Sequence, residues 1–478
     1  MYKHRLIAFA AVAAMAGPYA LPGSATAASA DELKELREQV RQLKESYEKR
    51  IEALEKRLQQ TEQAAGKAEA QASKAESVAV QAAAQAGARP SSESAFNPGI
   101  SLILNGTYGN LKRDPANYRI SGFAPTQGEV APPNRGLSLG ESEIVMSANI
   151  DSNFRGTLIA AIAPDDAISI EEGYIQTLRL GNGFNLKAGR FFSSVGYQNE
   201  IHAHAWDFTD TSLANKVFLG GRLAEDGVQL KWVAPTDLYL DVGIEAGRGR
   251  TFPAGPQGGR SKNGLGSGTL FAHVGGDIGT STAWRVGLSR FQTSPRDRTY
   301  DDLDAAGAAV TNAFTGKSRL MVVDGVLKWA PNGNPTQTNF KLQGEYFRRS
   351  ESGNLTYDTT AASLGTQAAD YASRQSGYYT QAVYQFMPRW RAGYRYDRLS
   401  AGTTSIGLVN SGALTAADFP LLNAYNPTRN TFMVDWSPSE FSRLRLQFAR
   451  DRSQIGASDT QVFLQYIMSL GAHGAHKF

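Results

Sequence analysis

Two histidines separated by one residue, His202 and His204, have the spacing that points most directly to chemistry. On an extended chain, residues i and i+2 project to the same side, so both imidazoles would face one space. Glu200 and Asp207 add carboxylate oxygens within the same stretch, EIHAHAWDFTD. Imidazole and carboxylate groups together suit Zn²⁺ or a similar borderline cation. The stretch predicts a metal site of these four residues; the alternative is polar loop residues bonded to backbone.

Enzyme signatures are scarce in this chain. It has six histidines and no cysteine, and it contains neither a P-loop nor an HExxH motif. No nucleophile, base and acid stand at a recognisable spacing. The chain is therefore not expected to be an enzyme, and zinc is the one cofactor that the pattern suggests.

Several short segments, 390–397 and 443–448 among them, alternate apolar and charged residues. Alternation with a period of two predicts β-strands that have one apolar and one polar face. If Trp232, Leu240, Tyr394 and Leu446 face lipid, the basic residues beside them face a pore. The predicted pore-lining residues are Lys187, Lys231, Arg285, Lys341, Arg391, Arg395, Arg443 and Arg445.

Acidic residues share the inward parity, so the predicted lining is mixed with a basic excess. Fixed positive charge at a constriction favours anions. The alternative is that these charges pair across strands and only hold the wall together. The inward acids are Asp241, Glu245, Glu345, Asp397 and Asp435.

About sixteen such strands follow Pro98, bounded by Gly, Pro, Asn and Asp. Short turns alternate with long segments, a pattern typical of transmembrane barrels rather than soluble sandwiches. The short turns are predicted at 151–153, 181–183, 234–237, 279–281, 331–336, 387–388 and 437–440, and the long segments at 113–137, 192–224, 249–267, 293–318, 350–376 and 399–427. The predicted fold is an all-β transmembrane barrel of about 16 antiparallel strands over residues 98–478. A soluble secreted β protein is the alternative.

The N-terminal part has a different organisation. Lys3 and Arg5 precede an eleven-residue apolar stretch, and small residues then offer a cleavage site after Ala27 or Ala30, so residues 1–27 are predicted to be a secretory signal peptide. Residues 31–86 carry a heptad seam and no proline, which predicts an α-helical coiled coil that self-associates; the alternative is a solvated helical spacer. Residues 87–97, with Pro90 and three serines, are predicted to be a linker.

Composition is consistent with this organisation. The net charge is +4, which is too small for a nucleic-acid-binding surface, so no nucleic acid partner is expected. Outside the N-terminus no apolar run reaches the length of a helical membrane span.

An even strand count places both barrel ends on the short-turn side, which in an outer membrane is the periplasm. Phe478, a terminal aromatic after an alternating strand, is the candidate signal for the barrel-assembly machinery.

The chain resembles the outer-membrane porins related to the phosphate-selective porin O/P family, especially the branch with an N-terminal coiled coil. The resemblance covers nearly the whole layout and, locally, AGRFFSSVGYQNEIHAHAWDF (188–208) and DGVQLKWVAPTDLYLDVGIEAGRG (226–249). It implies a sixteen-stranded, trimeric barrel with the loop 192–224 folded into the pore. Branches linked to zinc or other metals look similar in the histidine-containing stretch.

The expected function is passive diffusion of small hydrophilic solutes through an outer-membrane porin, with a mild anion preference. One alternative is a barrel that takes up zinc or a metal chelate at the histidine-containing loop. A second alternative is a structural anchor for the periplasmic coiled coil. The expected partners are outer-membrane lipid, the assembly machinery, two further copies of the chain, and small solutes or ions.

Overall fold

The computed structural model describes residues 98–124, 130–163, 167–255 and 263–471, together with eight separate positions between 38 and 56. The predicted signal peptide (1–27), linker (87–97) and Phe478 lie outside the described residues. Of the predicted coiled coil (31–86), only those eight positions are described; all are helical, and Arg41 pairs with Glu38 at 2.8 Å. The heptad seam stays a prediction.

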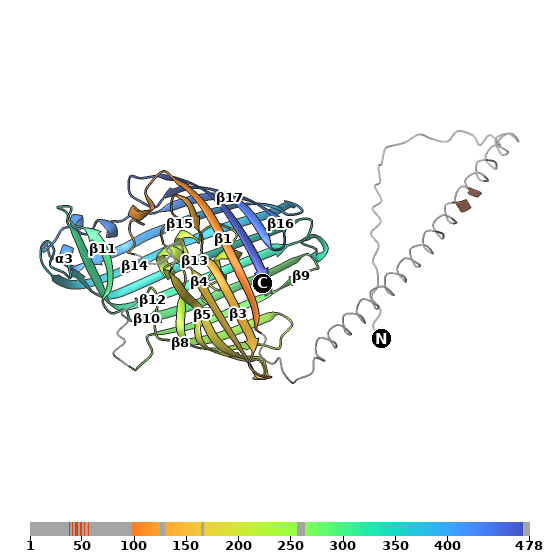
Figure 1. The fold of residues 1–478 in the computed structure, drawn as a ribbon, viewed down its shortest axis with the longest axis horizontal. Coiled ribbons are helices and arrows are strands. Elements are labelled where there is room, and N and C mark those ends of the chain that lie inside the picture. The colour runs from red at the N-terminus through yellow and green to blue at the C-terminus, as the bar shows by residue number, and fades with distance from the viewer. Residues whose placement is uncertain are drawn as a thin grey trace, which may run out of the picture. The chain divides into compact units, whose positions relative to one another are not determined.

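The described strands between Gly99 and Gly471 form a single antiparallel sheet (Figure 1). Its strands are β1 (Gly99–Leu111), β2 (Gly136–Leu139), β3 (Ser142–Asn149), β4 (Phe154–Ile162), β5 (Ile168–Thr177), β6 (Phe184–Phe192), β7 (Ala224–Val233), β8 (Tyr239–Gly247), β9 (Ser267–Ile278), β10 (Thr282–Thr293), β11 (Arg298–Leu303), β12 (Ala309–Trp329), β13 (Asn339–Tyr357), β14 (Gln367–Met387), β15 (Trp390–Ile406), β16 (Thr428–Ser439), β17 (Ser442–Arg452) and β18 (Asp459–Gly471).

The described helices are short. None of them is long and apolar enough to cross a bilayer. They are α2 (Leu213–Leu219), α3 (Gly407–Asn410) and the 3-10 turns η1 (Pro115–Asn117), η2 (Ala203–Ala205), η3 (Pro331–Gly333), η4 (Ala416–Asp418) and η5 (Pro420–Leu422).

The sheet closes on itself, because the first strand pairs with the last. In that seam Leu104 of β1 lies opposite Met468 of β18. β2 and β3 both pair with β1, so together they occupy one strand position around the barrel. β10 and β11 both pair with β12 and occupy another. The eighteen strands therefore form a sixteen-stranded barrel, as predicted from the alternation.

All seven predicted short turns are present, and they alternate with long connections. Three of the predicted long segments are wrong in extent. β12, β13, β14 and β15 run into 293–318, 350–376 and 399–427, so that only residues 358–366 join β13 to β14. The prediction failed because strands were identified by alternating apolar and polar residues. In these segments the outward residues are polar, as with Ser352 and Asp370.

Burial is inverted relative to a soluble protein over most of the wall. On β10, Leu288 is 52% exposed while its neighbour Ser289 is 1% exposed. On β16, Val434 points outward while Asp435 is buried inside. An apolar outside and a polar inside are typical of a membrane barrel.

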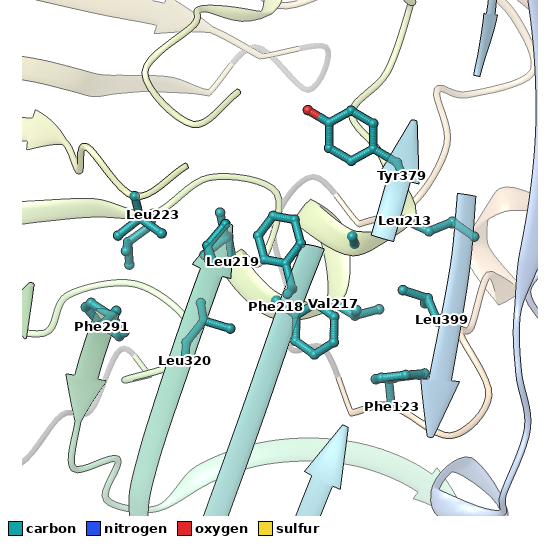
Figure 2. Packing of buried hydrophobic residues seen from close by; sticks show 14 of the residues in the cluster. Phe123, Leu213, Val217, Phe218, Leu219, Leu223, Phe291, Leu320, Tyr379 and Leu399 are labelled. Atoms are coloured by element: carbon teal, nitrogen blue, oxygen red, sulfur yellow. The ribbon is translucent and has the colours of Figure 1, made fainter. Parts of the chain in front are cut away.

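Apolar clusters fill two parts of the interior instead. One lies at the long-loop end, where Tyr357, Tyr371 and Phe419 pack together inside the extended strands. The other surrounds α2 and includes Phe218 (Figure 2). Phe218 stacks on Phe347 of β13, with 5.6 Å between the ring centroids.

Candidate functional site

The connection between β6 and β7, residues 193–223, folds into the barrel interior, and we name it the inner loop. It carries α2, whose start is capped by Ser212 accepting a hydrogen bond from the Asn215 amide. Gly220 ends the helix with φ 66°, a conformation that favours glycine. Figure 2 shows the apolar side chains of α2, such as Phe218, among those of the surrounding strands. This packing fixes one part of the loop inside the wall.

A first charged anchor joins the inner loop to carboxylates of β3 and β5. His202 Nδ1 lies 3.2 Å from Glu171 and its Nε2 lies 3.0 Å from Glu172, while His204 Nδ1 lies 3.0 Å from Glu143. Burial alone would lower the pKa of His202, but the hydrogen bonds with Glu143, Glu171 and Glu172 outweigh it and raise the pKa well above its usual value. We call these three glutamates the acidic wall.

A β-bulge makes the acidic wall possible. Ile159 of β4 lies opposite Glu172 and Ala160 lies opposite Ile170, so Glu171 is an extra residue between them. In a regular strand, two adjacent residues face opposite sides. Here the extra residue lets both adjacent carboxylates reach His202.

The far end of the inner loop returns to the same wall. Arg222 donates to Glu171 at 2.7 Å and to Glu141 at 2.6 Å. Its guanidinium also lies over the rings of Phe192 and Trp206, about 5 Å from each centroid. The acidic wall therefore holds the loop at two places.

Three groups of this cluster have the geometry for a metal ion. Within the described residues, one ligand atom each of Glu143, Glu171 and His202 lie within 4.8 Å of one another. Of the four ligands predicted from sequence, His202 belongs to this group, whereas Glu200 accepts a hydrogen bond from Ser194. Asp207 is also elsewhere, paired with Lys341 at 2.7 Å. Donors from strands distant in sequence replace the local carboxylates.

A second charged anchor joins the inner loop to basic residues of β15 and β16. Asp210 pairs with Lys216 at 3.1 Å, with Arg395 of β15 at 3.1 Å and with Arg429 of β16. Burial alone would raise the pKa of Asp210, but the charges of Arg429, Lys216 and Arg395 hold it well below its usual value. The carboxylate is thus ionised and buried among cations.

Asp207 makes a further contact with the same side of the barrel. It pairs with Lys341 of β13 at 2.7 Å and with Arg391 of β15 at 3.3 Å. Arg391, Arg443 and Arg445 also share one carboxylate, that of Asp435, at 2.5, 4.0 and 3.6 Å. We call the strand cations Lys341, Arg391, Arg395, Arg429, Arg443 and Arg445 the basic wall.

All eight basic residues predicted from parity point inward, but they differ in burial. Lys231, Arg285, Lys341, Arg391 and Arg443 keep 12–31% of their side chains exposed. Lys187, Arg395 and Arg445 are buried, and Arg395 and Arg445 bond to backbone carbonyls of the inner loop. These three do not line open space, because the loop or neighbouring side chains cover them.

An open cavity of about 430 Å³ lies between the inner loop and β7 to β10. Tyr197 and Glu200 of the loop line it, with Lys231, Asp241 and Arg285 from the strands. Both signs of charge therefore face this space.

One run, GLSLG at 136–140, matches the spacing of a hydrolase nucleophile elbow. Such an elbow needs its serine on a sharp turn between a strand and a helix. Ser138 lies instead within β2, where its hydroxyl donates to the Thr107 carbonyl at 3.4 Å. The run is part of the wall.

Comparison with known proteins gives one related sequence. An uncharacterised protein of Aquifex aeolicus (strain VF5) is 30% identical over 416 residues, which is 81% of each chain. The chain belongs to the family of this protein. No family model matches the chain. Because the Aquifex member of the family is uncharacterised, membership assigns no activity.

Solved structures similar to this member of the family are barrels from outer membranes. In-vitro folded OmpT, an outer membrane protein of Vibrio cholerae, has a TM-score of 0.46 and 9% identity, over 80% of this chain and 100% of that one. OprB of Pseudomonas putida has a TM-score of 0.44 and 12% identity, over 78% and 94%. The anion-selective porin of Comamonas acidovorans has a TM-score of 0.43 and 12% identity, over 78% and 99%. No property of these proteins transfers to the family at these values.

Sequence reasoning missed the acidic wall and Arg222. Glu143 has the parity of an inward residue in its strand, so alternation contained its signal. The adjacent pair Glu171 and Glu172 within a strand was a sign of a bulge, since one of two successive charges would otherwise face outward. Nothing local in the sequence links these glutamates to His202.

Proposed function

We propose that this protein is an outer-membrane porin through which small hydrophilic solutes diffuse passively. The observation that carries the proposal is the opposite character of the two faces of one closed wall: Leu288 and Val434 outside, Ser289 and Asp435 inside. A closed sheet satisfies its backbone hydrogen bonds without water, so such a wall can stand in lipid. Charged inner groups then offer solutes a polar path.

The partly exposed end of the basic wall supports a mild anion preference. Three partly exposed cations, Lys341, Arg391 and Arg443, pair within the described residues with two carboxylates, Asp207 and Asp435. One positive charge is left over at this place. Fixed positive charge beside a permeation path lowers the barrier for anions.

Further parts of the proposal concern kinship and assembly. We place the chain with the phosphate-selective porin O/P family and its branch with a periplasmic coiled coil. We also propose a homotrimer that meets through the outer face of β3 to β6. Small and apolar residues there, including Ala148, Gly156, Gly173 and Ala188, leave room for close contact.

Planar-bilayer recording of the refolded full chain tests the channel. We expect discrete conductance steps and, under a salt gradient, a reversal potential of the sign for modest anion preference. A protein that inserts into vesicles but gives no steps would contradict passive diffusion. A reversal potential of the cation-selective sign would contradict the charge argument.

A second candidate function is binding of a divalent metal ion such as Zn²⁺ at Glu143, Glu171 and His202. Once a metal ion displaces the proton of His202, four carboxylates (these two, Glu141 and Glu172) exceed the nearby cations Arg222 and Lys187 by two charges. A divalent ion would balance that excess. The ligand types suit zinc.

Calorimetric titration of the refolded chain with ZnCl₂ tests this candidate. We expect saturable binding that H202A and E171Q abolish and that E200Q, a matched loss of one carboxylate in the same loop, leaves intact. Heat-dependent gel mobility checks that each variant is folded. Equal zinc affinity in folded E171Q and wild type would contradict the site.

A further inference from the structure

Five basic side chains gather on the outside of the barrel wall, away from the interior site. They line a groove of about 810 Å³ across β10, β12, β13, β14 and β15. All five are exposed, and within the described part of the chain none forms an ion pair or a side-chain hydrogen bond. They are Arg290, Lys317, Arg319, Arg348 and Arg374. We call this set the outer groove.

The strand register brings these side chains together. Met321 of β12 lies opposite Arg290 on one side and opposite Arg348 on the other. Two residues further along β12, Arg319 lies opposite Ser350 of β13, and Ser350 lies opposite Arg374 of β14. Same-face diagonal neighbours in a sheet are about 7–8 Å apart, within reach of long side chains. The cations therefore form one zigzag patch rather than scattered charges.

The outer groove lies at an edge of the apolar outer surface. The next outward residue toward the short turns is Leu288 on β10, Met321 on β12 and Tyr346 on β13, with exposures of 52%, 49% and 45%. On the other side of the groove the outward residues are polar, as with Ser352 and Ser405. In a membrane, this boundary is the height of the lipid headgroups in the leaflet on the long-loop side.

We propose that the outer groove binds the phosphate groups of an anionic lipid in that leaflet. The inference rests on the proposed placement of the barrel in a membrane. Guanidinium groups bind phosphate oxygens in pairs, and five unpaired cations offer more than one phosphate a place. The apolar residues at the lower edge, Leu288 and Met321, then contact the acyl chains of the same lipid. A lipid with two headgroup phosphates fits this charge best.

Native mass spectrometry of the full chain, released from neutral detergent micelles doped with lipid A, tests the proposal. We expect lipid A adducts on the wild type, and about tenfold less bound lipid for R319Q/R348Q, at the centre of the groove. The charge-matched control is R450Q/R452Q on β17, whose two arginines also point outward. The control should stay within about twofold of wild type.

Several results would overturn the inference. Equal amounts of lipid A adduct on wild type and R319Q/R348Q would show that the outer groove does not bind the lipid. Equal losses in both double variants would show that the binding depends only on general surface charge. Displacement of lipid A by millimolar inorganic phosphate would make it a free-anion site. Insertion into neutral vesicles separates the two proposals: a wild type that does not insert contradicts the membrane channel, whereas inserted barrels with equal adducts contradict only the groove.

Discussion

The inner loop meets the barrel through two anchors of opposite sign. At His202 the loop supplies the base and the wall supplies three carboxylates. At Asp210 the loop supplies the carboxylate, and Arg395 and Arg429 of the wall supply the cations. The observed path pairs opposite charges at both ends, whereas the reverse path would bring like charges together. The comparison shows how charge sign can set the path of a loop.

The two anchors differ in how deeply their charged side chains are buried. Asp210, Arg395 and Arg429 are all buried, with α2 and its apolar cluster beside them. An ionised group buried without partners is costly, so such a set is stable only when complete. The side chain of His202 keeps 15% of its surface exposed, so water still reaches this anchor. The Asp210 anchor should therefore be the less tolerant of change.

The largest expected effect follows removal of the Asp210 charge. D210N leaves Arg395, Arg429 and Lys216 buried without their shared carboxylate, and we expect the free energy of unfolding to fall by about 3–5 kcal/mol. Urea titration of the barrel in lipid vesicles measures it. D207N is the matched control, since the partners of Asp207 are partly exposed, and it should cost less. A D210N barrel as stable as wild type would contradict the anchor.

The acidic wall should give a smaller effect. H202A removes hydrogen bonds to three carboxylates, and we expect a loss of about 2 kcal/mol in the same titration, with more current noise from a loosened loop. H204A, which loses the contact with Glu143, should cost less. If H202A destabilises the barrel more than D210N, the ranking of the two anchors is wrong.

Much of this architecture could be predicted from alternation and turns, because wall residues obey a period of two wherever lipid lies outside. The prediction failed in 350–376, where water replaces lipid and the outward residues lose their apolar character. It also failed at Glu171, because a bulge breaks the parity on which the inference depends. The partners of His202 and Asp210 could not be predicted, since loop-to-wall pairing is set by closure of the whole barrel.

The Asp210 anchor should also stay intact at mildly acidic pH. The pKa of Asp210 is lowered from 3.8, so its stabilisation is present above that value and is lost only as the pH falls through the lower folded value. We expect wild-type conductance and current noise to stay constant between about pH 7 and pH 4 on account of this anchor. A rise in noise at pH 5 that D210N already shows at pH 7 would mean that the pKa of Asp210 is raised above its ordinary value rather than lowered.

The smallest effect separates two neighbours within the basic wall. Arg443 keeps 26% of its side chain exposed and reaches the Trp206 carbonyl of the inner loop only at 3.5 Å, whereas Arg445 is buried and donates to the same carbonyl at 2.7 Å. R443Q should therefore lower the anion-to-cation permeability ratio by less than about twofold, with stability unchanged, because solvent screens an exposed charge. R445Q should leave that ratio nearly constant and weaken the loop instead. Reversal potentials of both variants measure ion selectivity, and urea titration measures stability. Together they decide whether the position of each arginine relative to the loop, and not its charge alone, determines which of the two properties it affects.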